Sequence, residues 1–156
     1  VQEIMPWMRQ TYPITSDSSR TLVGGMSAGG LAATFTAFRH PDIFGNVLSQ
    51  SANFGWFPEM NPASFWSYEI PPEEGWLIHQ FAIKEKMPLR FYLDAGLLED
   101  QRDCPITTIL HANRHMRDVL QAKGYGVHYA EFCGGHQYIN WRGTFADGLL
   151  ALIGRK

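Results

Sequence analysis

Short apolar runs alternate with segments of helical pattern along the whole of this chain. The apolar runs are candidate buried strands, and they cover 21–23, 44–49, 89–93 and 127–132. The helical patterns around them cover 3–11, 29–39, 73–86, 106–123 and 141–153. Strands separated by helices are typical of βαβ units, in which helices cover both faces of a parallel sheet. The alternation therefore predicts an α/β fold.

The composition fits one domain, 1–156, and excludes some partners. The chain has 156 residues and 45% hydrophobic content, and a domain usually takes roughly 100–200 residues. The net charge is −2 and no run of Lys or Arg stands out, which argues against nucleic acid or an anionic membrane surface as a partner. The longest apolar stretches, such as 31–38, are far shorter than the roughly 20 residues of a membrane span.

A glycine-rich turn follows the first apolar run and precedes a helical pattern. It contains the motif G-x-S-x-G as Gly25, Ser27 and Gly29, in the strand–turn–helix context of a serine nucleophile. We expect side chains at the glycine positions to clash with the neighbouring strand and helix. The helix N-terminus would favour an anion that develops beside Ser27. The alternative is a plain glycine-rich turn with a solvent-exposed serine, whereas a phosphate loop is excluded because no Lys-Ser/Thr pair follows the glycines.

One histidine follows the last predicted strand. His136 comes after Gly134 and Gly135, a turn that would present its imidazole at the carboxyl edge of the sheet. A serine nucleophile needs such a base, and the expected chain order is serine, acid, histidine. The other histidines fit less well because each lies in a predicted element or at a helix end: His40, His79, His111, His115 and His128. His111 and His115 have no third ligand nearby, so an exposed helix face is the better interpretation, and we expect neither metal nor cofactor.

The acid is expected after the strand predicted over 89–93. Glu99 lies on the loop after Gly96 and is well placed to reach across to the loop of His136. Asp94 is closer to the strand, where a local backbone hydrogen bond can occupy its carboxylate. The alternatives to Glu99 are Asp100, Asp94 and Asp103, and we interpret Asp100 and Asp103 as ordinary solvated loop acids.

A segment rich in proline and aromatic residues, 53–72, follows the second predicted strand. We expect its rings to overhang Ser27, with Trp56 and Phe57 as candidate substrate-binding residues. Aromatic rings stack on aromatic acyl groups such as a catecholate or a hydroxycinnamate. The alternative is that these rings simply pack the loop onto the core.

The two cysteines, Cys104 and Cys133, are too few for a disulfide framework and lack zinc-site spacing. A disulfide between them is the minor hypothesis, and two free thiols, the common state inside cells, are preferred. The chain starts at Val1 within an amphipathic helical pattern, without the basic and apolar regions of a signal peptide. We expect a cytoplasmic or periplasmic location.

These stretches together resemble the enterochelin (ferric enterobactin) esterase family, within the esterase D branch of the α/β-hydrolases. The resemblance rests on GMSAGGL at 25–31, HPDIFG at 40–45, LSQS at 48–51, GLLE at 96–99, GGH at 134–136 and WR at 141–142. It implies a serine–acid–histidine triad carried by Ser27, Glu99 and His136. It also implies that the backbone N–H of Ala28 supplies one oxyanion donor.

The chain departs from that family in two respects. Gln137 and Tyr138 follow the histidine where the family commonly has an acidic residue and an aromatic residue, which concerns substrate fit. The family's fold also has several strands before the nucleophile, where this sequence predicts a helix alone. We therefore expect a partial domain: the C-terminal part of an α/β-hydrolase fold, without the N-terminal strands and without the loop that carries the second oxyanion donor.

The resemblance implies a serine esterase that hydrolyses carboxylic esters, of the type that opens the tri-ester ring of a catecholate siderophore. One rival hypothesis is a feruloyl or acetyl esterase that acts on plant polysaccharide with the same triad. Another is a truncated, non-catalytic hydrolase remnant that only binds an aromatic ligand or a partner chain. Under both esterase hypotheses, the expected partner is a small-molecule ester substrate.

Overall fold

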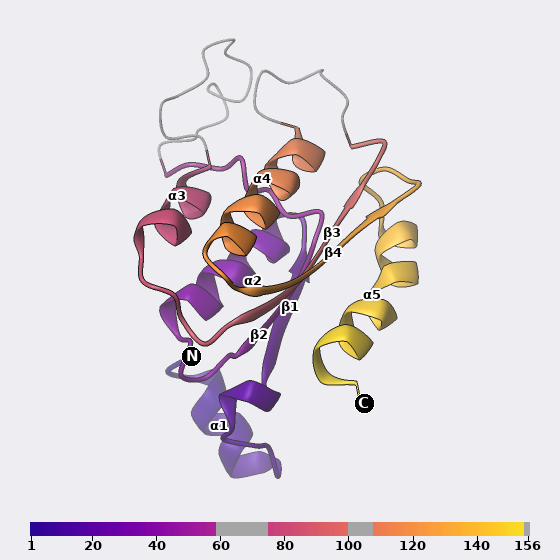
Figure 1. The fold of residues 1–156 in the computed structure, drawn as a ribbon. Coiled ribbons are helices and arrows are strands. Elements are labelled where there is room, and N and C mark those ends of the chain that lie inside the picture. Colours follow the sequence, from indigo (N-terminus) through magenta and orange to yellow (C-terminus); the bar gives the residue numbers. More distant parts are fainter. Residues whose placement is uncertain (59–74, 100–107, 155–156) are drawn as a thin grey trace.

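The computed structural model describes residues 1–58, 75–99 and 108–154 (Figure 1). The elements in chain order are α1 (Ile4–Thr11), the 3₁₀ helix η1 (Ser18–Arg20), β1 (Leu22–Met26), α2 (Ala28–Arg39), β2 (Asn46–Gln50), α3 (Trp76–Ile83), β3 (Arg90–Gly96), α4 (Ile109–Ala122), β4 (Gly126–Phe132) and α5 (Tyr138–Ile153). Each predicted strand and helix thus has a counterpart within these ranges. No helix in these ranges is long and apolar enough to cross a membrane.

The strands form a parallel sheet in the order β1-β2-β3-β4. The helices α2, α3 and α4 lie on one face of this sheet and α5 lies on the other (Figure 1). β2 is buried along its whole length because it has a neighbour on each side and helices above and below. The α/β prediction is therefore confirmed.

Each face of the sheet has its own core. The larger core lies under α2, α3 and α4, and its fully buried rings include Phe81 and Phe91, whose centroids are 5.7 Å apart. The smaller core joins Leu48 and Tyr92 of the sheet to Leu152 of α5. The C-terminal helix is therefore held to the sheet by few apolar contacts, and polar contacts described below add to them.

Several element boundaries differ from the sequence prediction by a few residues, and local contacts explain those at the ends of β1 and α4. β1 extends to Met26 rather than ending at position 23, because Gly24 pairs closely with Leu48 of β2. A Cβ on Gly24 would lie 3.1 Å from the carbonyl oxygen of Leu48, so this pairing suits glycine. α4 ends at Ala122 because Gly124 adopts a φ of 77°. The next N–H, of Tyr125, then donates back to the Leu120 carbonyl, which closes the helix end.

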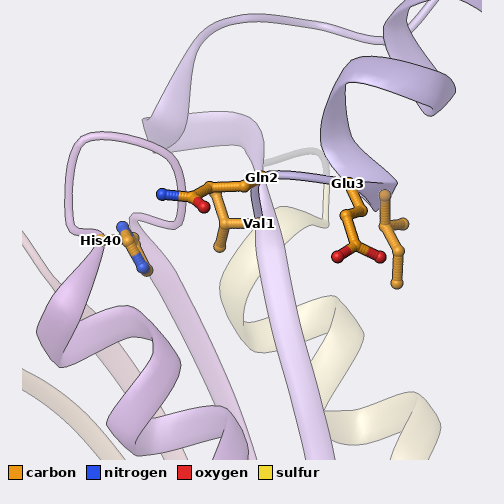
Figure 2. A pocket seen from close by; sticks show the side chains of 5 residues that line it. Val1, Gln2, Glu3 and His40 are labelled. Carbon is orange, nitrogen blue, oxygen red and sulfur yellow. The ribbon is translucent and has the colours of Figure 1, made fainter.

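α1 lies at the edge of the sheet where the strands begin (Figure 1), and none of its residues is buried. His40 is the C-cap residue of α2 at the same edge, which agrees with the helix end predicted there. A cavity of about 380 Å³ lies there, lined by Val1, Gln2, Glu3, Ile4 and His40 (Figure 2). This cavity is at the opposite edge from the carboxyl ends of the strands, where ligands of open α/β sheets bind.

Candidate active site

The carboxyl ends of the parallel strands bring together three side chains that are far apart in the sequence. Ser27 follows β1, Glu99 follows β3 and His136 follows β4. The Nε2 atom of His136 lies 2.7 Å from the Ser27 Oγ atom. Its Nδ1 atom lies 3.0 Å from the Glu99 Oε1 atom. The three residues that the sequence analysis selected for a triad therefore form one hydrogen-bonded chain in the structure.

The proton arrangement of this chain follows from the partners. A carboxylate accepts hydrogen bonds, so the imidazole proton is assigned to Nδ1 of His136, which donates to Glu99. Nε2 is then an acceptor for the Ser27 hydroxyl. The histidine side chain is 39% exposed whereas the Glu99 side chain is 1% exposed. A ligand can therefore reach the serine–histidine end, while the acid is shielded from water.

Ser27 sits in a strained turn between β1 and α2. Its backbone has a φ of 56° and a ψ of −126°, a conformation that residues with a side chain rarely adopt. The Ser27 N–H donates to the Gln50 carbonyl at 2.9 Å, and its own carbonyl accepts from the N–H of Gly30 at 3.0 Å. These bonds hold the turn against its strain and direct the hydroxyl away from the sheet.

The glycines of the motif have unequal roles. A Cβ on Gly25 would collide with the carbonyl oxygen of Gly29, as expected for this turn. A Cβ on Gly29 would meet no atom within 4 Å, so the predicted clash at that position is wrong. Gly30 has the close contacts instead, because a Cβ there would lie 2.9 Å from both the Ala52 Cβ and the Ser49 Oγ. α2 therefore approaches β2 at Gly30 and not at Gly29, the last glycine of the motif.

The loops that carry Glu99 and His136 are joined by backbone hydrogen bonds. The N–H of Leu98 donates to the Gly134 carbonyl at 3.0 Å. A Cβ on Gly96 would collide with that same carbonyl oxygen, so a glycine is needed where the loops meet. The second carboxylate oxygen of Glu99 accepts the Gly96 N–H at 2.9 Å. Glu99 is thus fixed at both oxygens and holds the imidazole in one orientation.

The alternative acids are placed differently. Asp94 lies on β3, is fully buried, and its Oδ2 atom accepts from Gln50 and Thr144 rather than from His136. Burial, more than any other cause, raises the pKa of Asp94 to about 6. Asp100 and Asp103 lie outside the described residues. Of the acids whose position is described, Glu99 is the partner of the histidine.

The Ala28 backbone is available for an oxyanion. Ala28 is the first residue of α2, and the first N–H groups of a helix have no acceptor within it. Ala28 is also exposed. The N-terminus of α2 carries partial positive charge at this point, directly beside the Ser27 hydroxyl. The position of Ala28 fits the predicted oxyanion donor, and its role stays a prediction.

The two candidate substrate-binding rings differ in exposure. Phe57 is 4% exposed and packs inside. Trp56 is partly exposed and meets the ring of Trp76 edge to face at 6.1 Å between centroids. Between them, Trp56 is the ring that a ligand can reach, whereas Phe57 occupies the packing role that the sequence analysis left as the alternative. The rest of the aromatic segment, 59–72, lies outside the described residues.

Further residues around the triad escaped the sequence analysis as functional candidates. A cavity of about 550 Å³ adjoins His136 and Glu99, and its walls include Leu98, Ile109 and Asn140. Gln50 and Trp141 make buried polar contacts behind the histidine, and Gln50 also contacts the half-buried Thr144. Gln50 could have been found from the sequence, because a glutamine inside a fully buried strand needs partners in the core.

Two other sequence interpretations concern cysteines and metal binding. Cys133 is an exposed free thiol, and Cys104 lies outside the described residues. Over the ranges that the structure describes, no three His, Cys, Asp or Glu side chains gather in a way that could hold a metal ion.

Comparison with known proteins places this arrangement in a family context. The iron(III) enterobactin esterase of Dickeya dadantii is 32% identical over 97% of this chain, which corresponds to 33% of that protein. The crystal structure of the Shigella flexneri enterobactin esterase in the presence of enterobactin matches with a TM-score of 0.77 and 29% identity, over 97% of this chain and 35% of that one. A ferulic acid esterase matches with a TM-score of 0.72 at 16% identity, over 97% of this chain and 58% of that one, which shows a shared fold alone.

These matches fix what part of the fold is present. The chain spans about a third of the length of the enterobactin esterases that it resembles. The parallel sheet with helices on both faces corresponds to the C-terminal part of the α/β-hydrolase fold, as predicted. A family model with the description "Putative esterase" matches residues 1–152, and the chain therefore belongs to this esterase family, together with the enterobactin esterases.

Proposed function

We propose that this chain carries the catalytic triad of a serine esterase that hydrolyses carboxylic esters, with Ser27 as nucleophile, His136 as base and Glu99 as orienting acid. The observation that supports the proposal most is the chain of contacts from Ser27 to His136 at 2.7 Å and from His136 to Glu99 at 3.0 Å. Both distances are within hydrogen-bond reach, which a nucleophile and its base require.

The first half of the reaction forms an acyl-enzyme. His136 Nε2 takes the proton of the Ser27 hydroxyl as the oxygen attacks the ester carbonyl carbon. Glu99 accepts a hydrogen bond from Nδ1 and stabilises the imidazolium that results. The tetrahedral oxyanion accepts a hydrogen bond from the Ala28 N–H. Collapse breaks the bond to the alcohol, which leaves with the proton of His136.

The second half regenerates the enzyme. Water gives a proton to His136 as its oxygen attacks the acyl carbon, and collapse of the second intermediate returns that proton to Ser27. The carboxylic acid is released. No redox step or cofactor is needed for this balance.

Rate depends on a complete oxyanion hole. Ala28 supplies one donor, and removing one donor from a pair typically costs ~10²–10³ in kcat. The chain spans about a third of its relatives, so we infer that the second donor is supplied by the remaining part of a longer protein. We therefore expect Ser27 of this chain to react with activated esters or phosphonates, whereas efficient turnover of ester substrates is expected to need the second donor.

The substrate class proposed is an ester with an aromatic acyl group, of the catecholate siderophore type. Similarity to iron(III) enterobactin and salmochelin esterases supports this class. The partly exposed ring of Trp56, on the segment that follows β2, is a candidate surface for stacking an aromatic acyl group.

The test is the intact mass before and after exposure to a fluorophosphonate probe, with Ser27→Ala as the control. An adduct on the wild type that is absent from Ser27→Ala is expected. Hydrolysis of enterobactin in preference to feruloylated sugars would then support the siderophore type. Absence of an adduct from a folded wild type, in this chain and in a longer protein that contains it, would refute the catalytic proposal.

A further inference from the structure

We propose that Gln50, Asp94 and Thr144 form a buried clamp that fixes the first turns of α5, and with them Trp141, against the imidazole of His136. The clamp residues are positioning residues: none of them contacts the reacting atoms, and they act through the orientation of the histidine. This inference rests on the proposed function, because a clamped histidine matters when His136 is the base.

Gln50 links the clamp to the nucleophile. It is the last residue of β2, and its carbonyl accepts the N–H of Ser27 at 2.9 Å. Its side chain extends to the face of the sheet that α5 covers. There its Nε2 atom lies 3.0 Å from the Trp141 carbonyl and 2.7 Å from the Thr144 hydroxyl. One residue therefore contacts both the strained nucleophile turn and the helix that follows the histidine loop.

Asp94 is the shared acceptor of the clamp. Its Oδ2 atom accepts from the Thr144 hydroxyl at 2.7 Å and from Gln50 Nε2 at 3.1 Å. Asp94 pairs with Gln50 in the register of β2 and β3, so the carboxylate is delivered to this position by the sheet. A rigid sheet thus holds α5 at its N-terminal end by polar contacts, where the apolar core of that face is small.

Trp141 transmits this placement to the histidine. Its ring meets the imidazole of His136 edge to face, at 4.8 Å between centroids and an interplanar angle of 89°. The indole Nε1–H donates to the Ser51 hydroxyl at 2.8 Å, which fixes the ring at its far side. Ser51 itself has a φ of 45°, and its N–H donates to the Asp94 carbonyl at 2.8 Å. Strained backbone of this kind is a feature of functional sites.

The clamp is costly to bury, which argues against a purely structural origin. Asp94 Oδ1 and Gln50 Oε1 are buried without a hydrogen-bond partner among the described residues. Burial also raises the pKa of Asp94 well above its usual value. Apolar residues of similar shape fill a core at lower cost.

The test compares Thr144→Val with Thr144→Ser and with Thr34→Val. Thr144→Val removes the hydroxyl and keeps the volume, whereas Thr144→Ser keeps the hydroxyl. Thr34→Val is a matched control, because the buried Thr34 hydroxyl donates to the Gly30 carbonyl at 2.8 Å, away from the clamp. The primary readout is the low-field proton resonance of the His136 Nδ1–H, assigned with Glu99→Gln.

We expect Thr144→Val to shift or broaden this resonance and to lower kcat for a nitrophenyl ester roughly tenfold with KM little changed, since small misplacements of a base lower kcat. Thr144→Ser and Thr34→Val should leave both readouts near wild type. A resonance and a kcat in Thr144→Val that match those of Thr34→Val would overturn the proposal.

A second variant covers the case in which Thr144→Val does not fold. Gln50→Met conserves volume, removes the donor and also removes the unpaired Oε1 atom, so it is expected to fold. It should give the same change in the resonance, and an unchanged resonance in folded Gln50→Met would also overturn the clamp. A wild type that takes no phosphonate adduct would count against the proposed function, while the resonance comparison would still decide on the clamp.

Discussion

Asp94→Asn is expected to stabilise the protein at neutral pH. Burial raises the pKa of Asp94 from 3.8 to about 6, so the unfolded chain loses this proton at lower pH than the folded chain. Between about pH 4 and pH 6 the folded state binds more protons, and stability therefore falls as pH rises. A tenfold difference in proton affinity corresponds to about 1.4 kcal/mol. The ionised carboxylate thus costs about 3 kcal/mol above pH 6, and the neutral amide avoids this cost.

The assay is urea unfolding of wild type and Asp94→Asn from pH 4 to pH 8, followed by tryptophan fluorescence. The two proteins should have similar free energies of unfolding at pH 4, and the variant should gain up to about 3 kcal/mol by pH 7. Other titrating groups act on both proteins, so the difference isolates Asp94. Asp147→Asn, at an exposed position of α5, is the control and should show little change. A variant less stable than wild type at pH 7, or a difference independent of pH, would refute the reasoning.

Three further changes have defined outcomes. Gly25→Ala should lower the free energy of unfolding by about 2 kcal/mol or more in urea titrations, because the added Cβ collides with the Gly29 carbonyl. Gly29→Ala should not lower it, because a Cβ at that position of α2 meets open space. Glu99→Gln should lower kcat for a nitrophenyl ester by ~10³–10⁴ through loss of the correct tautomer, with KM little changed, and an unchanged kcat would remove Glu99 from the triad. Trp56→Ala should raise KM for aromatic acyl esters more than for acetyl esters, and an equal effect on both would argue against stacking.

Much of the fold could be predicted from the sequence because its signals are local. Alternation of apolar runs and helical patterns gave the order of the elements, and the position of each polar residue after a strand gave Ser27, Glu99 and His136. The carboxyl ends of parallel strands lie at one edge of the sheet. Residues that follow different strands can therefore be predicted to meet there, even when the packing of the helices is not known. The contacts from Ser27 to His136 and from His136 to Glu99 agree with the expectation that these side chains meet at one edge, and their catalytic roles stay predictions.

The clamp could not be predicted in the same way because its parts lie inside elements rather than after them. Gln50 and Asp94 are strand residues, and their side chains meet through the register of β2 with β3, which the pattern of the sequence does not specify. Thr144 lies in α5, and its contact depends on the rotation of that helix against the sheet. The prediction of a clash at Gly29 was wrong for a related reason. The rotation of α2 against the sheet brings Gly30, not Gly29, close to β2, and the sequence pattern does not specify that rotation.

The charge of Asp94 is expected to lower the free energy of unfolding and, at the same time, to improve the orientation of α5 and His136. As a buried carboxylate it costs free energy at neutral pH, yet a charged acceptor makes stronger hydrogen bonds to Gln50 and Thr144 than a neutral amide does. Asp94→Asn should therefore be more stable and yet hold α5, and through Trp141 the imidazole of His136, less firmly. Such a trade between stability and activity is expected where a core residue supports a site. If the variant proved both more stable and equal to wild type in the His136 resonance, the charge of Asp94 would have no positioning role and the clamp would depend on the neutral contacts of Gln50 and Thr144.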